Sequence, residues 1–311
     1  MWISANLGKG VIMGVLDNGI TPGHPSFEDA GLSVPPAKGK GSCALKSGCN
    51  NKIIGAQNFI TRCSVFGMAP LAHLAIYQVC DSARCSLAAV LAGMDAGIKD
   101  GVDMLSLSLG GLSIPLDIDP IAIGGFAAVE KGIFVSCATG NSGPDPSFIS
   151  NEAPWVLTVV ASSIDRSLRA SITLGNGKKI NGESMDQSSK FPESFLHLFY
   201  GSSCSSLSAS DVKDKVVVCE LLESGSPEEI VSTVSNAGGI VIFMNIASRG
   251  NTIVVQSFNF PTAILSNNDG CIIQSYATSS LDPTTTISFD GAVLEIYPAP
   301  AVASFSSRGP A

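Results

Sequence analysis

The chain has 311 residues, a net charge of −8 and a pI near 4.8, with 45% hydrophobic and 14% charged residues. This length is sufficient for one large domain or two smaller ones. No uninterrupted apolar stretch reaches the roughly 18 residues that a membrane-spanning helix needs. Lys and Arg are scattered rather than gathered into a basic patch. The totals favour a soluble acidic globule and argue against a membrane span or a nucleic-acid partner.

The first predicted strand is the apolar run Gly10–Leu16, which ends in Asp17 and passes at once into an Asn-Gly turn. Such a run, polar only at its last residue, predicts a strand buried on both faces of a parallel sheet. Catalytic groups collect at the carboxyl ends of strands in such sheets, which makes Asp17 a candidate. Asp17 equally fits an Asp-Asn-Gly turn, and this segment alone does not separate the two interpretations.

Strands and helices then alternate as far as about residue 170. The predicted strands are 74–80, 102–109, 133–138 and 155–161, and the predicted helices are 86–100 and 121–131. Ser86 is placed to cap the first of these helices, and its apolar face would consist of Leu87, Val90, Leu91, Met94 and Ile98. Repeated strand–helix–strand units predict a doubly wound α/β domain with a mostly parallel sheet.

The texture changes after about Thr173, where polar stretches separate short β-like runs. Two such runs, 215–219 and 239–243, enclose a predicted helix over 227–237. We interpret residues 190–290 as a small α+β module inserted into the larger domain. The tail, 301–310, is predicted to be a strand that resumes the first domain.

Nine cysteines include three close pairs, Cys43 with Cys49, Cys80 with Cys85, and Cys204 with Cys219. The short spacings and the presence of only three histidines disfavour zinc. Short-loop disulfides formed in an oxidising compartment fit better. The pairing of the other three cysteines, Cys63, Cys137 and Cys271, is left open. Because the total is odd, at least one thiol remains unpaired. The first ten residues do not have the form of a signal peptide.

Three glycine-containing segments carry possible chemistry. Gly8-x-Gly10-x-x-x-Gly14 precedes a strand instead of following one, so we predict no dinucleotide and no other cofactor. In Ala138–Pro144, Asn141 is either a turn former or a preorganised donor to an oxyanion. The segment Ser106–Gly111 is either an ordinary strand end or an edge that pairs with an extended peptide.

Taken together and in order, these segments resemble the subtilisin-like serine proteases, most closely the plant subtilases of the cucumisin type. The matching stretches cover nearly the whole chain; they are 10–19, 51–56, 69–77, 103–111, 140–144, 151–155 and 303–310. The resemblance implies a subtilisin-type α/β fold interrupted by a protease-associated (PA) insertion. It also implies disulfides at the three close cysteine pairs and an extracellular, apoplastic location.

The resemblance assigns roles to individual residues. Asp17 matches the triad aspartate, which orients a histidine, and Asn141 matches the side-chain donor of the oxyanion hole. The strand that pairs with the backbone of a peptide or protein substrate matches Ser108, Leu109 and Gly110. The wall of the primary specificity pocket matches Ala138, Thr139 and Gly140. Asn18 departs from the Thr or Ser usual in the family.

Other parts of the family pattern have no counterpart. The Gly-His-Gly-Thr-His helix should lie between Asn58 and Gly67, but only Ile60–Phe66 separates the flanking landmarks. The Gly-Thr-Ser-Met-Ala motif would come after Ala311, and a signal peptide and propeptide would precede Met1. We therefore expect 1–175 to be the N-terminal part of the peptidase domain without its His helix, 190–290 the PA-like insertion, and 291–311 the start of a C-terminal part without the serine motif.

The remaining histidines, His24, His73 and His197, are not expected to act as the base. Without His and Ser the chain as written is expected to be inactive. Three hypotheses follow: an incomplete or mispredicted endopeptidase sequence, a truncated inactive paralogue, or a peptide-binding decoy that uses the Ser108–Gly110 edge and the inserted module. A skipped exon between the codons for Phe59 and Gly67 would separate the first two. Because the missing helices would pass through the core, we also expect exposed apolar strand faces and an aggregation-prone α/β portion, whereas the inserted module could fold by itself.

Overall fold

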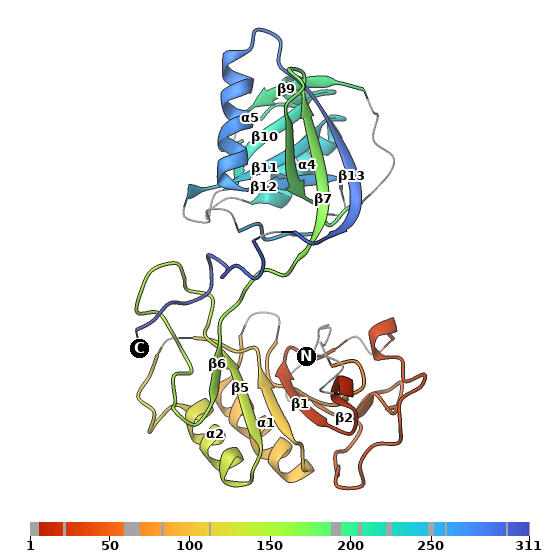
Figure 1. Ribbon diagram of the computed structural model, residues 1–311, viewed down its shortest axis with the longest axis vertical. Helices are drawn as coiled ribbons and strands as arrows, with labels where there is room; N and C mark the ends of the chain where they lie inside the picture. Colours follow the sequence, from red (N-terminus) through yellow and green to blue (C-terminus); the bar gives the residue numbers. More distant parts are fainter. Residues whose placement is uncertain are drawn as a thin grey trace. The chain divides into compact units, whose positions relative to one another are not determined.

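The chain forms two structural units, Met1–Ala161 with Ser306–Ala311, and Ser162–Phe305 (Figure 1). The computed structural model describes residues 6–20, 23–58, 69–81, 84–111, 113–187, 194–204, 207–221, 226–247, 252–258, 260–296 and 298–310. Cys63 and the segment 60–66 lie outside these ranges.

The first unit is built on a six-stranded sheet with the order β2-β3-β1-β4-β5-β6. Every neighbouring pair is parallel. The strands are β1 (Ile12–Asp17), β2 (Ile53–Asn58), β3 (His73–Gln78), β4 (Met104–Leu107), β5 (Phe134–Ala138) and β6 (Leu157–Val159). Two short 3-10 helices, Asn6–Gly8 and Pro25–Phe27, lie beside β1 in the sequence. The predicted α/β class with a parallel sheet is confirmed.

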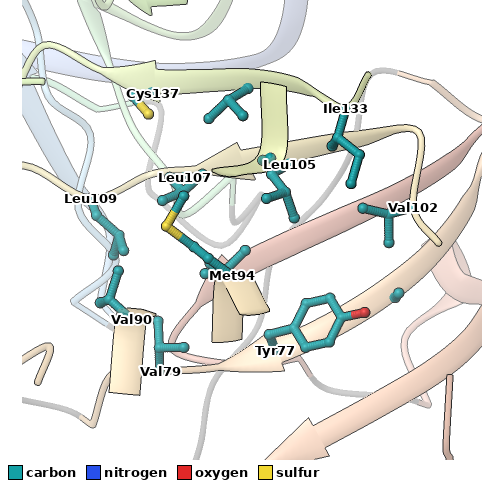
Figure 2. Packing of buried hydrophobic residues seen from close by; sticks show 14 of the residues in the cluster. Tyr77, Val79, Val90, Met94, Val102, Leu105, Leu107, Leu109, Ile133 and Cys137 are labelled. Carbon is teal, nitrogen blue, oxygen red and sulfur yellow. The ribbon is translucent and has the colours of Figure 1, made fainter. Parts of the chain in front are cut away.

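One face of this sheet is covered by α1 (Leu87–Asp100) and α2 (Pro120–Glu130). Ser86 occupies the N-cap position of α1 without a side-chain cap bond, and Gly101 ends the helix at φ 74°. In α2 the cap is made by Asp119, which accepts the Ile121 N–H. Figure 2 shows the core between these helices and the sheet, in which Tyr77, Met94 and Leu105 are buried. Side chains that alternate along each strand supply this layer.

The opposite face of the sheet is open at β5 and β6. Val135 and Cys137 pack under the helices, so the alternation of side chains turns Phe134 the other way. Phe134 is 53% exposed, and Leu157 on β6 is 50% exposed. Parallel sheets ordinarily have both faces covered, and the described residues leave this part uncovered. Apolar side chains are therefore exposed on this face of the sheet.

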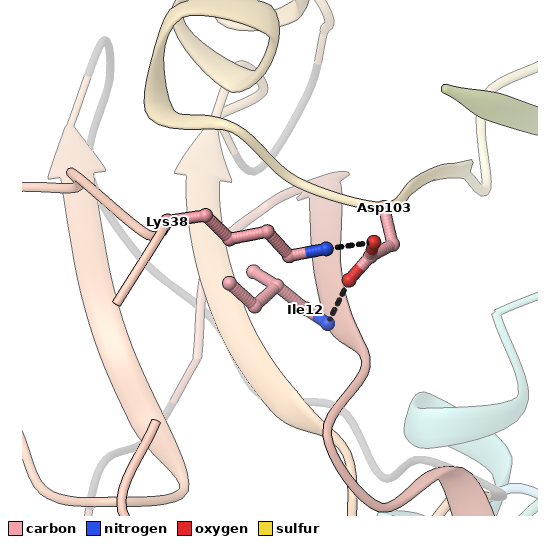
Figure 3. A network of polar contacts seen from close by, with 3 residues as sticks. All are labelled: Ile12, Lys38 and Asp103. Atoms are coloured by element: carbon pink, nitrogen blue, oxygen red, sulfur yellow. Dashed lines mark hydrogen bonds and ion pairs between the residues drawn. The ribbon is translucent and has the colours of Figure 1, made fainter. Parts of the chain in front are cut away.

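A carboxylate fixes the register of β1 and β4 at their amino ends (Figure 3). Asp103 Oδ2 accepts the backbone N–H of the buried Ile12 at 2.8 Å, and Oδ1 is bound by Lys38. The Asp103 N–H in turn donates to Ile12 O at 2.8 Å. Because register is set at this end, the carboxyl ends of β1 and β4 come level at Leu16 and Leu107.

The second unit contains a closed barrel with the order β10-β11-β12-β8-β7-β13-β9. Its strands are β7 (Arg166–Leu174), β8 (Lys179–Glu183), β9 (Leu196–Tyr200), β10 (Val216–Leu221), β11 (Ile240–Asn245), β12 (Thr262–Leu265) and β13 (Thr284–Leu294); its helices are α3 (Ala209–Val212), α4 (Pro227–Asn236) and α5 (Asn267–Ser279). Two apolar clusters fill the unit, one including Ile273 of α5 and the other Val231 and Val234 of α4.

The structural boundaries differ from the expected ones. Residues 162–175 belong to the barrel and not to the 1–175 segment, because β7 pairs with both β8 and β13. Residues 291–305 likewise belong to the second unit. The predicted tail strand is wrong: residues 303–310 form turns and bends, with one isolated bridge between Ser162 and Val302.

Each of the three close cysteine pairs forms a disulfide in the structure: Cys43–Cys49, Cys80–Cys85 and Cys204–Cys219. Cys137 is a buried free thiol and Cys271 an exposed one. Among the described residues, no helix has the length and apolar character needed to cross a bilayer.

Candidate functional site

The candidate site lies along the carboxyl edge of three adjacent strands. Asp17 ends β1, Ser108 follows β4, and Ala138 ends β5, in the sheet order β1-β4-β5. Parallel strands present their carboxyl ends at one edge, so the structure brings the sequence-predicted residues to the same side of the sheet.

Asp17 is half-buried, ends β1 and is followed by a bend at Asn18. Its Oδ1 accepts the N–H of Asn18 at 2.7 Å, and Gly19 follows at φ 100°. This contact satisfies the turn interpretation without opposing the catalytic one, because a carboxylate has two oxygens and several lone pairs.

The segment Ser108–Gly110 continues β4 beyond its ladder with the neighbouring strands, because the pairing with β1 and β5 ends at Leu107. Its closest approach to the next segment is at two glycines, where a Cβ on Gly110 would lie 2.6 Å from the Cα of Gly140. Gly110 therefore has no room for a side chain, and Gly140 is restricted by its φ of 92° and by the hydroxyls of Ser150 and Ser307, each 3.0 Å from where its Cβ would lie.

A side chain outside both strands connects their ends. Asn151 Nδ2 donates to Leu109 O and to Ala138 O, each at 2.7 Å. Its neighbour Ser150 donates to Thr139 O through both its N–H and its Oγ, each at 3.0 Å. Both residues are buried. Sequence reasoning placed Asn151 inside a matching motif but gave it no role.

The turn that carries Asn141 is held from the far end of the chain. Ser307 N–H donates to Gly140 O at 3.0 Å, and Ser307 Oγ accepts the Ser142 N–H at 3.1 Å. Gly140 has φ 92°, and the Asn141 side chain is exposed. Ser307 thus holds the residues on either side of Asn141, a role that its sequence position did not reveal.

The histidines occupy structural positions. His73 begins β3, and Gln78 ends it, where it pairs with Asp17. The length of strand between His73 and Gln78 is about 16 Å, so His73 and Asp17 lie at opposite ends of the strands. The buried His73 ring contacts Asn51 O through Nδ1 at 2.6 Å. His24 Nδ1 accepts the Ser26 N–H at 3.2 Å.

The third histidine, His197, lies in the second unit, 3.0 Å from an oxygen of Asp282. No group of three or more His, Cys, Asp or Glu side chains that could hold a metal ion occurs within the described ranges.

Comparison with known proteins gives a coherent set of relatives. A family model described as "Subtilase family" matches residues 8–311. Subtilisin-like protease SBT1.4 of Arabidopsis thaliana is 35% identical over 374 residues, covering 100% of this chain and 48% of that protein. Subtilisin-like protease SBT1.5 is 34% identical (98% and 49%), and the CO(2)-response secreted protease is 34% identical (96% and 47%), both from the same plant.

The chain thus spans about half the length of the curated relatives that it matches. Among solved structures, the prenylagaramide maturation protease PagA aligns with a TM-score of 0.37 and 22% identity, over 52% of this chain and 57% of that one. A score this low indicates only a distant likeness.

Proposed function

Because the chain belongs to the subtilase family, we propose that it represents a subtilisin-like serine endopeptidase and that residues 1–311 are catalytically inactive. The proposal covers peptide-bond hydrolysis by Asp-His-Ser acyl transfer in an intact form of the protein. In that form Asp17 would orient the histidine, and Asn141 would stabilise the oxyanion.

One observation carries the proposed inactivity. The sequence from Ile60 to Phe66 contains no histidine and is too short for a motif that opens a long helix. This gap is internal, so it does not depend on where the chain begins or ends. An alignment of 374 positions against 311 residues also requires gaps in this chain, which supports an internal deletion.

The chemistry fixes the size of the effect. A serine hydroxyl at neutral pH needs an adjacent general base to become a nucleophile. In subtilisin, loss of the serine or the histidine alone lowers kcat by roughly 10⁶-fold. His73 cannot take over this role, because it lies at the opposite edge of the sheet from Asp17.

The test is to purify residues 1–311 and to assay them with a mixture of fluorogenic peptides and with a fluorophosphonate serine probe. A competent subtilase of similar length run in parallel confirms that both assays work. We expect neither turnover nor labelling. We expect the same of any longer form of the protein in which no residues are added to the sequence between Asn58 and Gly67. Site-specific labelling by the probe would contradict the proposal.

A second candidate function is non-catalytic binding of extended peptides at Ser108–Gly110. It is favoured by one observation, that the backbone of this segment continues past the ladders that end at Leu107. An unpaired strand edge can accept an extended peptide through main-chain hydrogen bonds. The affinity of a labelled peptide, measured by fluorescence anisotropy, should fall when its backbone is N-methylated, because N-methylation removes donors without changing side chains. Equal binding of both peptides would refute edge pairing.

We further propose that the Ser162–Phe305 unit is the PA-like insertion and that the protein acts outside the cell. The chain leaves the first unit at Ala161 and re-enters it at Ser306, as an inserted domain requires. Three disulfides, together with a relative named as a secreted protease, support an oxidising extracellular setting.

A further inference from the structure

We propose that Asn151 is a positioning residue that fixes the spacing of the two segments flanking the primary specificity pocket, Ser108–Gly110 and Ala138–Gly140, and thereby its selectivity for side chains. This inference rests on the proposed binding of peptides at this edge.

The geometry of the contact supports this role. One amide nitrogen carries two hydrogens, and Asn151 directs one to Leu109 O and one to Ala138 O, each at 2.7 Å. With the hydrogens about 120° apart, the two carbonyl oxygens are held about 4.7 Å apart. The Asn151 amide therefore links the backbone beyond β4 to the end of β5, past the last paired residues Leu107 and Cys137.

The backbone of Asn151 is held in the conformation that this contact needs. Its φ of 60° lies in the left-handed region, which Asn tolerates better than most residues. Thr158 Oγ1 donates to Asn151 O at 2.5 Å, and the side chain is 94% buried, since its exposure is 6%. The amide is thus anchored before any ligand arrives.

Ser150 also joins the flanking segments, because its Oγ donates to Thr139 O at 3.0 Å and accepts the Gly111 N–H at 3.5 Å. The contact to Gly111 is long, so the two 2.7 Å bonds of Asn151 are the shorter link between the segments. Gly110 and Gly140 approach each other closely, since a Cβ on Gly110 would lie 2.6 Å from the Cα of Gly140, and the Ser150 hydroxyl lies beside both positions. Loss of the Asn151 amide removes the donor that the carbonyl oxygens of Leu109 and Ala138 share. The pocket is then free to widen, and its selectivity should fall while backbone pairing along β4 persists.

The experiment compares three variants of residues 1–311. Asn151→Gly keeps the left-handed backbone accessible and removes the amide, and Asn151→Asp keeps the shape but replaces the donor by a carboxylate oxygen. Glu152→Gln is the control, an amide–carboxyl exchange one residue further along. Binding is measured for extended peptides that differ only in the side chain at the pocket position, including a glycine peptide.

We expect the ratio of Kd between disfavoured and preferred side chains to fall by about tenfold in both Asn151 variants, the effect of losing one to two hydrogen bonds. Affinity of the glycine peptide should change by less than about threefold, and Glu152→Gln should match the parent. An unchanged ratio in Asn151→Gly overturns the proposal.

Amide hydrogen exchange gives an independent answer that needs no ligand. Both segments, 108–111 and 138–142, should exchange at least about tenfold faster in Asn151→Gly, with β1 and β3 unaffected. If no peptide binds the parent chain, the peptide-binding proposal fails, yet faster exchange still supports the positioning role. Unchanged exchange in both segments refutes it.

Discussion

Removal of the Asp103 carboxylate should destabilise the first unit, and the size of the loss depends on the replacement. Asp103 makes a charge-assisted hydrogen bond to the N–H of Ile12, a residue that is 1% exposed, and an ion pair with Lys38. Asp103→Ala leaves a buried donor unsatisfied, which costs about 2–3 kcal/mol. Asp103→Asn retains an acceptor oxygen and loses mainly the half-exposed ion pair, so its cost should stay below about 1 kcal/mol.

Urea unfolding followed by tryptophan fluorescence measures this difference. Both tryptophans of the chain, Trp2 and Trp155, belong to the first unit, so the signal reports that unit alone. Asp95→Asn is the matched control, because Asp95 pairs with Lys99 across one exposed helical turn, a contact worth less than about 0.5 kcal/mol. Equal losses in Asp103→Ala and Asp103→Asn would refute the argument that the Ile12 bond dominates.

Four further outcomes are expected. Gly140→Ala should destabilise the first unit by about 1–2 kcal/mol in the same urea assay, because φ is 92° and a Cβ would lie 3.0 Å from two serine hydroxyls. Burial, together with the Asp119 carboxylate, raises the pKa of the Cys137 thiol to about 12, so at pH 8 only about one thiol in 10⁴ is ionised; iodoacetamide should modify Cys271 and leave Cys137 intact, as mass spectrometry would show. Phe134→Lys should lower dye binding and light scattering without lowering the urea midpoint, and an unchanged signal would mean that the open sheet face does not drive association. Limited proteolysis should leave 162–305 as the longest-lived fragment, and equal degradation of both units would contradict its independent stability.

The strands of the first unit were predictable because they are buried in a parallel sheet. The runs 74–80 and 133–138 are mostly apolar, with one polar residue each, Gln78 and Ser136. Strand β5 lies within the second run, and β3 begins one residue before the first. The barrel was harder to recognise. Strand β7 mixes Arg166, Arg169 and three Ser or Thr residues with buried apolar positions, because one side of the strand faces solvent. That pattern concealed the start of the second unit at Ser162.

The residues of the candidate site also differ in how far the sequence alone could predict them. The positions of Asp17 and Asn141 in the fold were predictable, because Asp17 ends the buried strand β1 and Asn141 lies three residues beyond the end of β5; their catalytic roles are proposals. Asn151 and Ser307 were not, because their partners are far away in the sequence: Leu109 is 42 residues from Asn151, and Ser142 is 165 residues from Ser307. A polar residue in a loop resembles any turn former until the fold shows which carbonyl it meets.

The components that shape this edge are independent of the shortened segment. Asn151 donates to the carbonyl oxygens of Leu109 and Ala138, and Ser307 bonds to Gly140 and Ser142, whereas the family's histidine would come from between Asn58 and Gly67. The hydrogen bonds described at this edge join residues outside that segment, so the proposed loss of the general base would leave them in place. In the proposed function binding and hydrolysis would be separable, because the groups proposed to hold a peptide and the group that would activate a nucleophile come from different parts of the sequence.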